Sequence, residues 1–265
     1  SYFAVLTRAM LAGLLFLPLL RIRLLPRPVV PGLLVVGALQ FGVTYICLYQ
    51  SFEYISVPEV LLFTIFTPLH VALIDDLLNR RFSLGPLVAA AIAVLGAGIM
   101  RYDGLSDSFI RGFLILQLAN FTFAAGQVGY AHLVRRYELT STQQWRGFGL
   151  FFIGALMVML PAWLLLGNPE RLPHTALQWS VLAWLGLVAS GLGFLFWNRG
   201  AAQVDAGTLG IMNNALVPAG LLVNLLIWNH DADLLRLAAG SAVIGLSLWV
   251  NARWSRWFGS RPARP

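Results

Sequence analysis

The side chains with the clearest chemical potential are amides that lie inside long apolar stretches of the chain. Asn213 and Asn214 are adjacent in the apolar run 205–228, and Gln117 and Asn120 lie three residues apart in another. An amide offers hydrogen-bond donors and an acceptor, and inside a membrane it is costly unless it is paired. These residues can therefore bind a polar ligand or join two helices. For the adjacent pair we favour ligand binding, with one asparagine facing the ligand and the other bracing a helix, since neighbouring helical side chains diverge by about 100°.

Gln117 and Asn120 also share a helix face with Gln127, at spacings of three and seven residues. A polar stripe on a membrane helix avoids lipid, so it faces other helices or a cavity, and we favour a cavity for Gln117 and Asn120. Further polar or aromatic residues that we expect to line a cavity lie in three other apolar runs: Gln40, Tyr45, Phe63, Phe66, Trp197 and Asn198. The alternative for the aromatic members is ordinary packing or an interfacial belt.

Three charged or titratable side chains lie within apolar runs. Arg8 is the only arginine well inside one, so it requires an anionic ligand or a neighbouring acid. Glu59 and His70 are candidates for proton coupling, and histidine titrates near neutrality. However, Ser56 and Glu59 also fit a capping box, in which the acid reaches back to the helix start, and we favour that interpretation. A lone histidine in an apolar helix is more often part of a structural hydrogen bond.

The composition indicates which class of protein must position these residues. The chain has 265 residues, of which 58% are hydrophobic and 11% are charged, whereas a typical soluble domain has about 25% charged residues. This excludes an ordinary soluble enzyme and a disordered chain. The single cysteine, Cys47, cannot form an internal disulfide, and the sequence has no paired metal-ligand spacing and no nucleotide-binding motif. We therefore expect a polytopic membrane protein without a cofactor or a metal.

Apolar runs of about 20 residues, the length that crosses a bilayer as a helix, occur nine times. They lie near residues 4–20, 32–51, 57–78, 85–101, 108–133, 146–166, 177–199, 205–228 and 235–254. Runs of this length exceed the strands of a membrane β-barrel, and a helix satisfies its own backbone hydrogen bonds in lipid. The sequence therefore predicts an all-α integral membrane protein.

The basic residues predict the topology rather than a partner. All eighteen are arginine, and the formal net charge is +7. They form no basic stripe and no recognition motif, so we expect no nucleic-acid partner. Thirteen arginines lie in one set of alternate loops and four in the other, and cytoplasmic loops carry the excess of positive residues. We therefore expect a cytoplasmic C-terminus and an external Ser1.

An internal repeat relates the two halves of the chain. Residues 49–51 match 197–199 at an offset of 148, and Thr67-Pro68 matches Val217-Pro218 at an offset of 150. Duplicated halves of opposite orientation are typical of transporters. The second half has five apolar runs and the first has four, so we expect one further helix before Ser1 and ten helices in all. The predicted organisation is a first half at 1–105, a second half at 106–256 and a cytoplasmic tail at 257–265.

The pattern of five plus five helices, with Pro68 and Pro218 at equivalent places, resembles the EamA-type drug/metabolite transporter superfamily. Segments 96–103, 203–214 and 217–224 are similar to the biotin transporters of that superfamily. The resemblance implies a ten-helix fold of two inverted five-helix repeats in the bacterial inner membrane. It also implies uptake of biotin by alternating access, with the lipid bilayer as the other partner. We further expect a monomer.

The implied substrate assigns roles to the candidate residues. A ureido ring requires amide-type donors and acceptors, the apolar part of biotin requires aromatic walls, and its carboxylate requires a cation or clustered donors. We match the pair Asn213-Asn214 to the ureido ring and Arg8 to the carboxylate. Export of amino acids or other metabolites is the alternative, since related folds carry unrelated cargo. An intramembrane enzyme is disfavoured, because Ser190 has no candidate base in hydrogen-bond reach.

Overall fold

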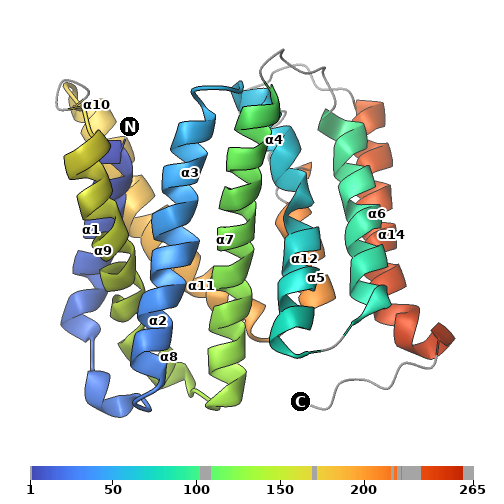
Figure 1. Ribbon diagram of the computed structural model, residues 1–265, viewed down its shortest axis with the longest axis horizontal. Coiled ribbons are helices and arrows are strands. Elements are labelled where there is room, and N and C mark those ends of the chain that lie inside the picture. Colours follow the sequence, from blue (N-terminus) through green and yellow to red (C-terminus); the bar gives the residue numbers. More distant parts are fainter. Residues whose placement is uncertain are drawn as a thin grey trace. The chain divides into compact units, whose positions relative to one another are not determined.

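The computed structural model describes residues 2–80, 82–101, 109–168, 172–215, 218, 219, 222 and 234–258, and the regular elements within them are helices (Figure 1). Contacts divide the chain into two compact units. Unit 1 contains residues 1–50 and 125–203, and unit 2 contains residues 51–124 and 204–265. Each unit thus combines a segment from each predicted half. The predicted boundary at 105/106 lies outside the described residues, as does most of the predicted tail, so the repeat boundaries stay a prediction.

Unit 1 begins with α1 (Tyr2–Phe16) and the 3₁₀ turns η1 (Leu17–Leu19) and η2 (Ile22–Leu24). A long helical segment follows, composed of α2 (Val29–Gly37), the π-helical η3 (Ala38–Val43) and α3 (Thr44–Ser51). The later elements are α8 (Ser141–Gly147), α9 (Gly149–Leu166), α10 (Ala176–Trp184), the π-helical η5 (Leu185–Leu192) and α11 (Gly193–Ala201). The 28-residue α7 (Phe109–Arg136) begins in unit 2 and ends in unit 1.

Two glycines allow α2 and α9 to touch backbone to backbone. A Cβ atom at Gly37 would collide with the carbonyl of Phe151, and one at Gly154 would collide with the carbonyl of Leu34. Small residues at membrane helix interfaces permit this approach and the dispersion contacts that follow from it. The phenylalanines beside this contact complete the core: the rings of Phe148 and Phe151 stack with their centroids 5.0 Å apart.

Unit 2 contains α4 (Val57–Phe63), the 3₁₀ turn η4 (Thr64–Phe66), α5 (Thr67–Leu78), α6 (Leu84–Arg101), α12 (Ala206–Asn214) and α14 (Leu234–Phe258). Helices α6 and α14 lie side by side, and α12 packs against α5 (Figure 1). The α12–α5 contact depends on Gly210, where a Cβ atom would lie 3.2 Å from the Cα atom of Pro68.

Five helical segments of the described chain are long and apolar enough to cross a membrane: Tyr2–Leu19, Val29–Ser51, Glu59–Leu78, Ser141–Leu166 and Ala176–Ala201. They coincide with five of the nine predicted runs, and helices occupy the other four at least in part. The run 205–228 extends beyond the described residues. The protein is therefore a multi-pass, all-helical membrane protein, and the count of ten helices stays a prediction.

Candidate functional site

The guanidinium of Arg8 is the central feature of unit 1. Its Nε donates to the hydroxyl of Ser190 at 3.0 Å, and one terminal nitrogen donates to the hydroxyl of Tyr45 at 3.0 Å. Its central carbon lies 4.8 Å from the centroid of the Tyr45 ring and 5.9 Å from that of Phe41. Within the described part of the chain no carboxylate pairs with Arg8. A guanidinium has five N–H groups, so three remain for a ligand.

The residues around Arg8 lie in or shortly after two π-helical segments that occupy equivalent places in the predicted repeat. Segments η3 and η5 begin 147 residues apart and end 149 apart, and the sequence repeat has an offset of 148. Ser190 lies in η5, and Tyr45 follows η3 by two residues. A π-helical turn is rare and frequently marks a functional site. The sequence did not predict either segment, because both are almost wholly apolar and a shift in helical phase leaves little trace where nearly every position is apolar.

The amide of Gln40 lies in η3 and is fully buried. Among the residues that the structure describes, neither its Oε1 nor its Nε2 has a hydrogen-bond partner. Gln127 on α7 is equally buried, but its Oε1 accepts a hydrogen bond from the indole nitrogen of Trp197 at 2.9 Å. The Nδ2 of Asn198 donates to the carbonyl of Phe194 at 3.0 Å, and its buried Oδ1 is unpartnered. The three amides differ: in the described structure Gln40 makes no hydrogen bond, Gln127 bonds to Trp197, and Asn198 uses only its nitrogen.

In unit 2, the first apolar helix is interrupted before Pro68. Since proline has no N–H, the carbonyl of Thr64 lacks its usual donor four residues on. The N–H of Thr67 donates to Thr64 instead, as does the Thr67 hydroxyl at 2.7 Å. The carbonyl of Phe63 thereby loses its usual donor, Thr67, and accepts two side-chain amides: Gln117 at 3.2 Å and Asn120 at 2.9 Å.

The amide pair on α12 is also engaged with backbone carbonyls. The Nδ2 of Asn214 donates at 3.0 Å to the carbonyl of Ile65, which lies in the same interrupted segment. The Nδ2 of Asn213 donates at 2.9 Å to Leu209, one turn back on its own helix. The two side chains thus diverge, as expected for neighbours, and Asn214 supports the break in the other helix. Backbone groups freed inside a membrane require such partners.

The two predicted titratable residues of unit 2 have separate partners. His70 and Gln117 share a hydrogen bond of 3.0 Å between Nε2 and Oε1. Glu59 is buried, and its Oε2 accepts from both the backbone N–H and the hydroxyl of Ser56, each at 2.7 Å. This is the reach-back contact expected from the capping box. In the part of the chain that the structure describes, no hydrogen bond joins Glu59 to His70, so a joint proton path stays a prediction.

The predicted aromatic walls of unit 2 pack on one another. The rings of Phe63 and Phe66 both meet Phe113 edge to face, with centroids 5.0 and 5.9 Å apart. Such pairs contribute to packing beyond their buried area. They are compatible with a cavity wall and with plain helix packing alike.

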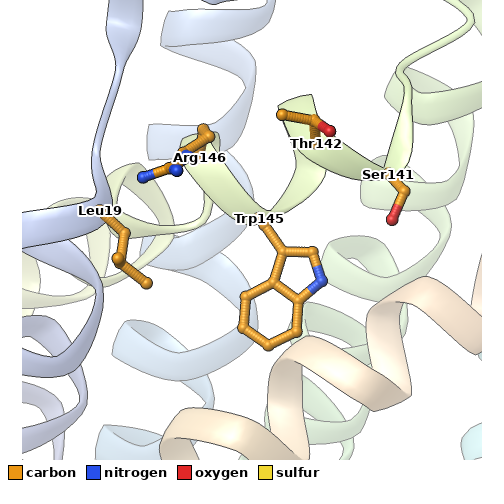
Figure 2. Close-up of a pocket in the computed structure, with 5 residues that line it drawn as sticks. All are labelled: Leu19, Ser141, Thr142, Trp145 and Arg146. Atoms are coloured by element: carbon orange, nitrogen blue, oxygen red, sulfur yellow. The ribbon is translucent and has the colours of Figure 1, made fainter.

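A hollow of about 300 Å³ lies beside α8 in unit 1, lined by Leu19, Ser141, Thr142, Trp145 and Arg146 (Figure 2). At its edge, Arg199 donates to the hydroxyl of Ser141 at 2.7 Å and lies 5.8 Å from the ring of Trp145. The hollow is cationic and aromatic, and sequence analysis predicted none of these residues as ligands. None of the residues that line it belongs to the predicted substrate-binding residues.

Similarity to known proteins shows that the chain belongs to the EamA-like transporter family. The family model matches residues 1–102. A protein of Pseudomonas aeruginosa named "Probable biotin transporter" is 64% identical over 95% of this chain and 87% of its own length. Proteins named "Biotin transporter" from Escherichia coli K12 and Salmonella typhimurium are each 49% identical over 96% of this chain and 84% of their own lengths.

A solved crystal structure shares the fold. It is 17% identical, has a TM-score of 0.77, and covers 97% of this chain and 89% of its own. The family membership makes the protein a transporter and sets aside the intramembrane enzyme that the sequence disfavoured.

Proposed function

We propose that the protein is a secondary transporter that imports biotin across the bacterial inner membrane by alternating access. The names of the relatives at 64% and 49% identity support the substrate. The structural observation that carries the proposal is Arg8, a guanidinium inside an apolar helix that is held by Tyr45 and Ser190. The partners are thus a small-molecule substrate and the lipid bilayer, and we expect a monomer with its C-terminus in the cytoplasm.

The chemistry of Arg8 fits the carboxylate of biotin. An uncompensated cation within a membrane span is costly, and an anionic substrate in a low-dielectric cavity is equally costly without a cation. Binding the two together removes both penalties. Ser190 and Tyr45 fix the orientation of the guanidinium before the substrate arrives, so little ordering remains to be done on binding.

The proposed architecture is a pair of inverted five-helix repeats, ten helices in all, that alternate in access. The matched positions of η3 and η5 support this proposal. Because the sequence has no nucleotide-binding motif, the energy comes from an ion or substrate gradient or from metabolic trapping of the vitamin.

The predicted ligands divide by their bonding. Backbone carbonyls at the interrupted helix accept hydrogen bonds from Gln117, Asn120 and Asn214. These bonds support a structural role for the three side chains. Tyr45, Trp197 and Asn198 belong to unit 1 with Arg8. We propose that this second group contacts the substrate, with the rings of Tyr45 and Trp197 packing on its apolar part.

The test is uptake of labelled biotin into proteoliposomes that contain the purified protein. We expect saturable uptake that unlabelled biotin abolishes and that other vitamins and amino acids leave unchanged. Empty liposomes and liposomes with an unrelated membrane protein are the controls. Failure of excess biotin to compete, together with accumulation of amino acids, would favour the metabolite-exporter alternative.

A further inference from the structure

Gln40 is a polar group that the fold buries without pairing. Its exposed fraction is 0%, and within the described part of the chain both polar atoms of its amide lack a hydrogen-bond partner. A buried amide without partners carries a desolvation penalty that ordinary protein interiors avoid. The large majority of buried polar atoms are hydrogen-bonded. An apolar side chain of similar shape would fill the same place without this penalty, so packing alone does not account for a glutamine here.

Two features of the backbone, one in the segment that contains Gln40 and one on the facing helix α7, favour the buried position of this side chain. Gln40 lies in the π-helical segment η3, which displaces side chains from their regular α-helical positions. On α7, a Cβ atom at Gly126 would collide with the Cβ atom of Gln40. Only glycine therefore permits this approach. The residue next to Gly126, Gln127, bonds to Trp197.

Gln40 also belongs to the segment that holds Arg8. The neighbouring residue Phe41 and the nearby Tyr45 both place their rings next to the Arg8 guanidinium. A cation with spare donors and an amide with spare donors and an acceptor thus lie along one stretch of unit 1. A ligand that uses both carries an anionic group and a separate neutral group that donates and accepts hydrogen bonds.

We propose that Gln40 recognises the ureido group of the substrate, a role that the sequence assigned to the pair Asn213-Asn214. This inference rests on the proposed function. The Nε2 of Gln40 donates to the ureido carbonyl, and its Oε1 accepts from a ureido N–H, so the two planar groups pair edge to edge. The penalty of the unpaired amide is then relieved only in the complex. Since Gln40 is covered in this structure, the packing over it opens during the transport cycle.

The first experiment separates binding from folding with a near-isosteric apolar variant. In purified protein, Gln40→Met removes both hydrogen bonds, and we expect biotin to bind about tenfold more weakly or worse. The melting temperature of Gln40→Met should equal or exceed that of the wild type, because an unpaired amide is replaced by an apolar side chain. Gln127→Met is the matched control. It is equally buried but strands the indole nitrogen of Trp197, so its melting temperature should fall.

The second experiment combines a variant of Gln40 with an analogue of biotin that is altered in the ureido group. In 2-iminobiotin the ureido carbonyl is replaced by an imine that is protonated near neutral pH. Gln40→Glu presents a carboxylate that only accepts hydrogen bonds. We expect this variant to lose affinity for biotin and to gain affinity for 2-iminobiotin relative to wild type, an inversion that a merely structural glutamine would not produce.

The outcomes separate the two proposals. Wild-type protein that does not bind biotin overturns the proposed function. Wild-type protein that binds biotin while Gln40→Met binds it equally well overturns the role of Gln40 alone. A lower melting temperature for Gln40→Met than for wild type, with no inversion in Gln40→Glu, also overturns it by making Gln40 a structural residue.

Discussion

The side-chain amide of Asn120 donates at 2.9 Å to the backbone carbonyl of Phe63, which lies 57 residues earlier in the chain. This hydrogen bond replaces one that the helix itself gives up, since the N–H of Thr67 donates to Thr64. The origin of the exchange is Pro68, which has no N–H to offer Thr64. One proline thus determines where an amide from another helix must bond.

Replacing Pro68 should reduce the contribution of Asn120 to the stability of the protein. In Pro68→Ala the new N–H can donate to Thr64, which releases the Thr67 N–H to donate to Phe63. Asn120→Ala alone should lower the free energy of unfolding by about 1–3 kcal/mol, because it removes a donor from a buried carbonyl. In the Pro68→Ala background the same change should cost clearly less. Thermal and denaturant unfolding of the four variants in detergent measures the coupling, and additive effects would contradict this account.

Arg8→Gln should abolish the preference for a free carboxylate. A charge-assisted hydrogen bond contributes about 1.5–3 kcal/mol, so the variant should bind biotin about ten- to a hundredfold more weakly. Biotin methyl ester, which lacks the charge, should be affected little. Competition binding with the acid and the ester measures the ratio in both proteins.

Tyr45→Phe is the companion variant for Arg8. It keeps the ring beside the guanidinium and removes the hydroxyl that holds it at 3.0 Å. We expect a smaller loss of affinity with the preference for the acid retained. A wild type that binds acid and ester alike would show that no carboxylate site exists.

Glu59→Gln should leave the pH profile of uptake unchanged. Glu59 accepts from the backbone and the hydroxyl of Ser56, and glutamine also serves at this position of a capping box. Glu59→Ala should lower the free energy of unfolding by about 1 kcal/mol, as the loss of a helix cap typically does. Uptake measured across pH together with thermal unfolding distinguishes the cap from a proton carrier, for which Glu59→Gln would abolish the pH dependence.

Some of this architecture follows directly from the sequence. The apolar runs predict the helices, because length and hydropathy are local properties. The spacing of Ser56 and Glu59 is also local, and it predicts the cap at the start of α4. Helix α8 has a capping box in which Thr140 and Gln143 bond reciprocally, and α10 has the equivalent box at Thr175 and Gln178. Both have the spacing of Ser56 and Glu59, so the same local pattern in the sequence indicates them.

The bonding of the candidate site depends on contacts between distant segments. The sequence shows that Arg8 and the amides require partners, but Ser190 is 182 residues from Arg8 and Ile65 is 149 from Asn214. The amides of Gln40 and Gln127 are identical in type and burial, and among the described residues only Gln127 has a hydrogen-bond partner. No local pattern distinguishes them, because the difference is made by Trp197 on another helix.

Asp205, in the connection before α12, should make the stability of unit 2 depend on acid pH. Its Oδ1 accepts from the Thr208 N–H and from the Nδ2 of Asn251 on α14, each at 2.9 Å, and its Oδ2 accepts from the Thr208 hydroxyl at 2.7 Å. Partial burial acts to raise the pKa of this carboxyl, but the hydrogen bonds from Asn251 and Thr208 together hold the pKa below its ordinary value of 3.8.

A carboxyl whose pKa is lower in the folded state stabilises the fold above its unfolded pKa, and the contribution is lost as the pH falls through the folded value. Wild type should therefore melt at a higher temperature than Asp205→Asn at neutral pH, and the difference should shrink as the pH falls below 3.8. Asn251→Ala removes one of the bonds that lower the folded pKa of Asp205, so this variant should lose less stability than wild type over the same acid range. Melting temperatures of the three proteins in detergent across this range measure the effect, and a difference that stays constant down to the lowest pH would show that charge plays no part in the cap.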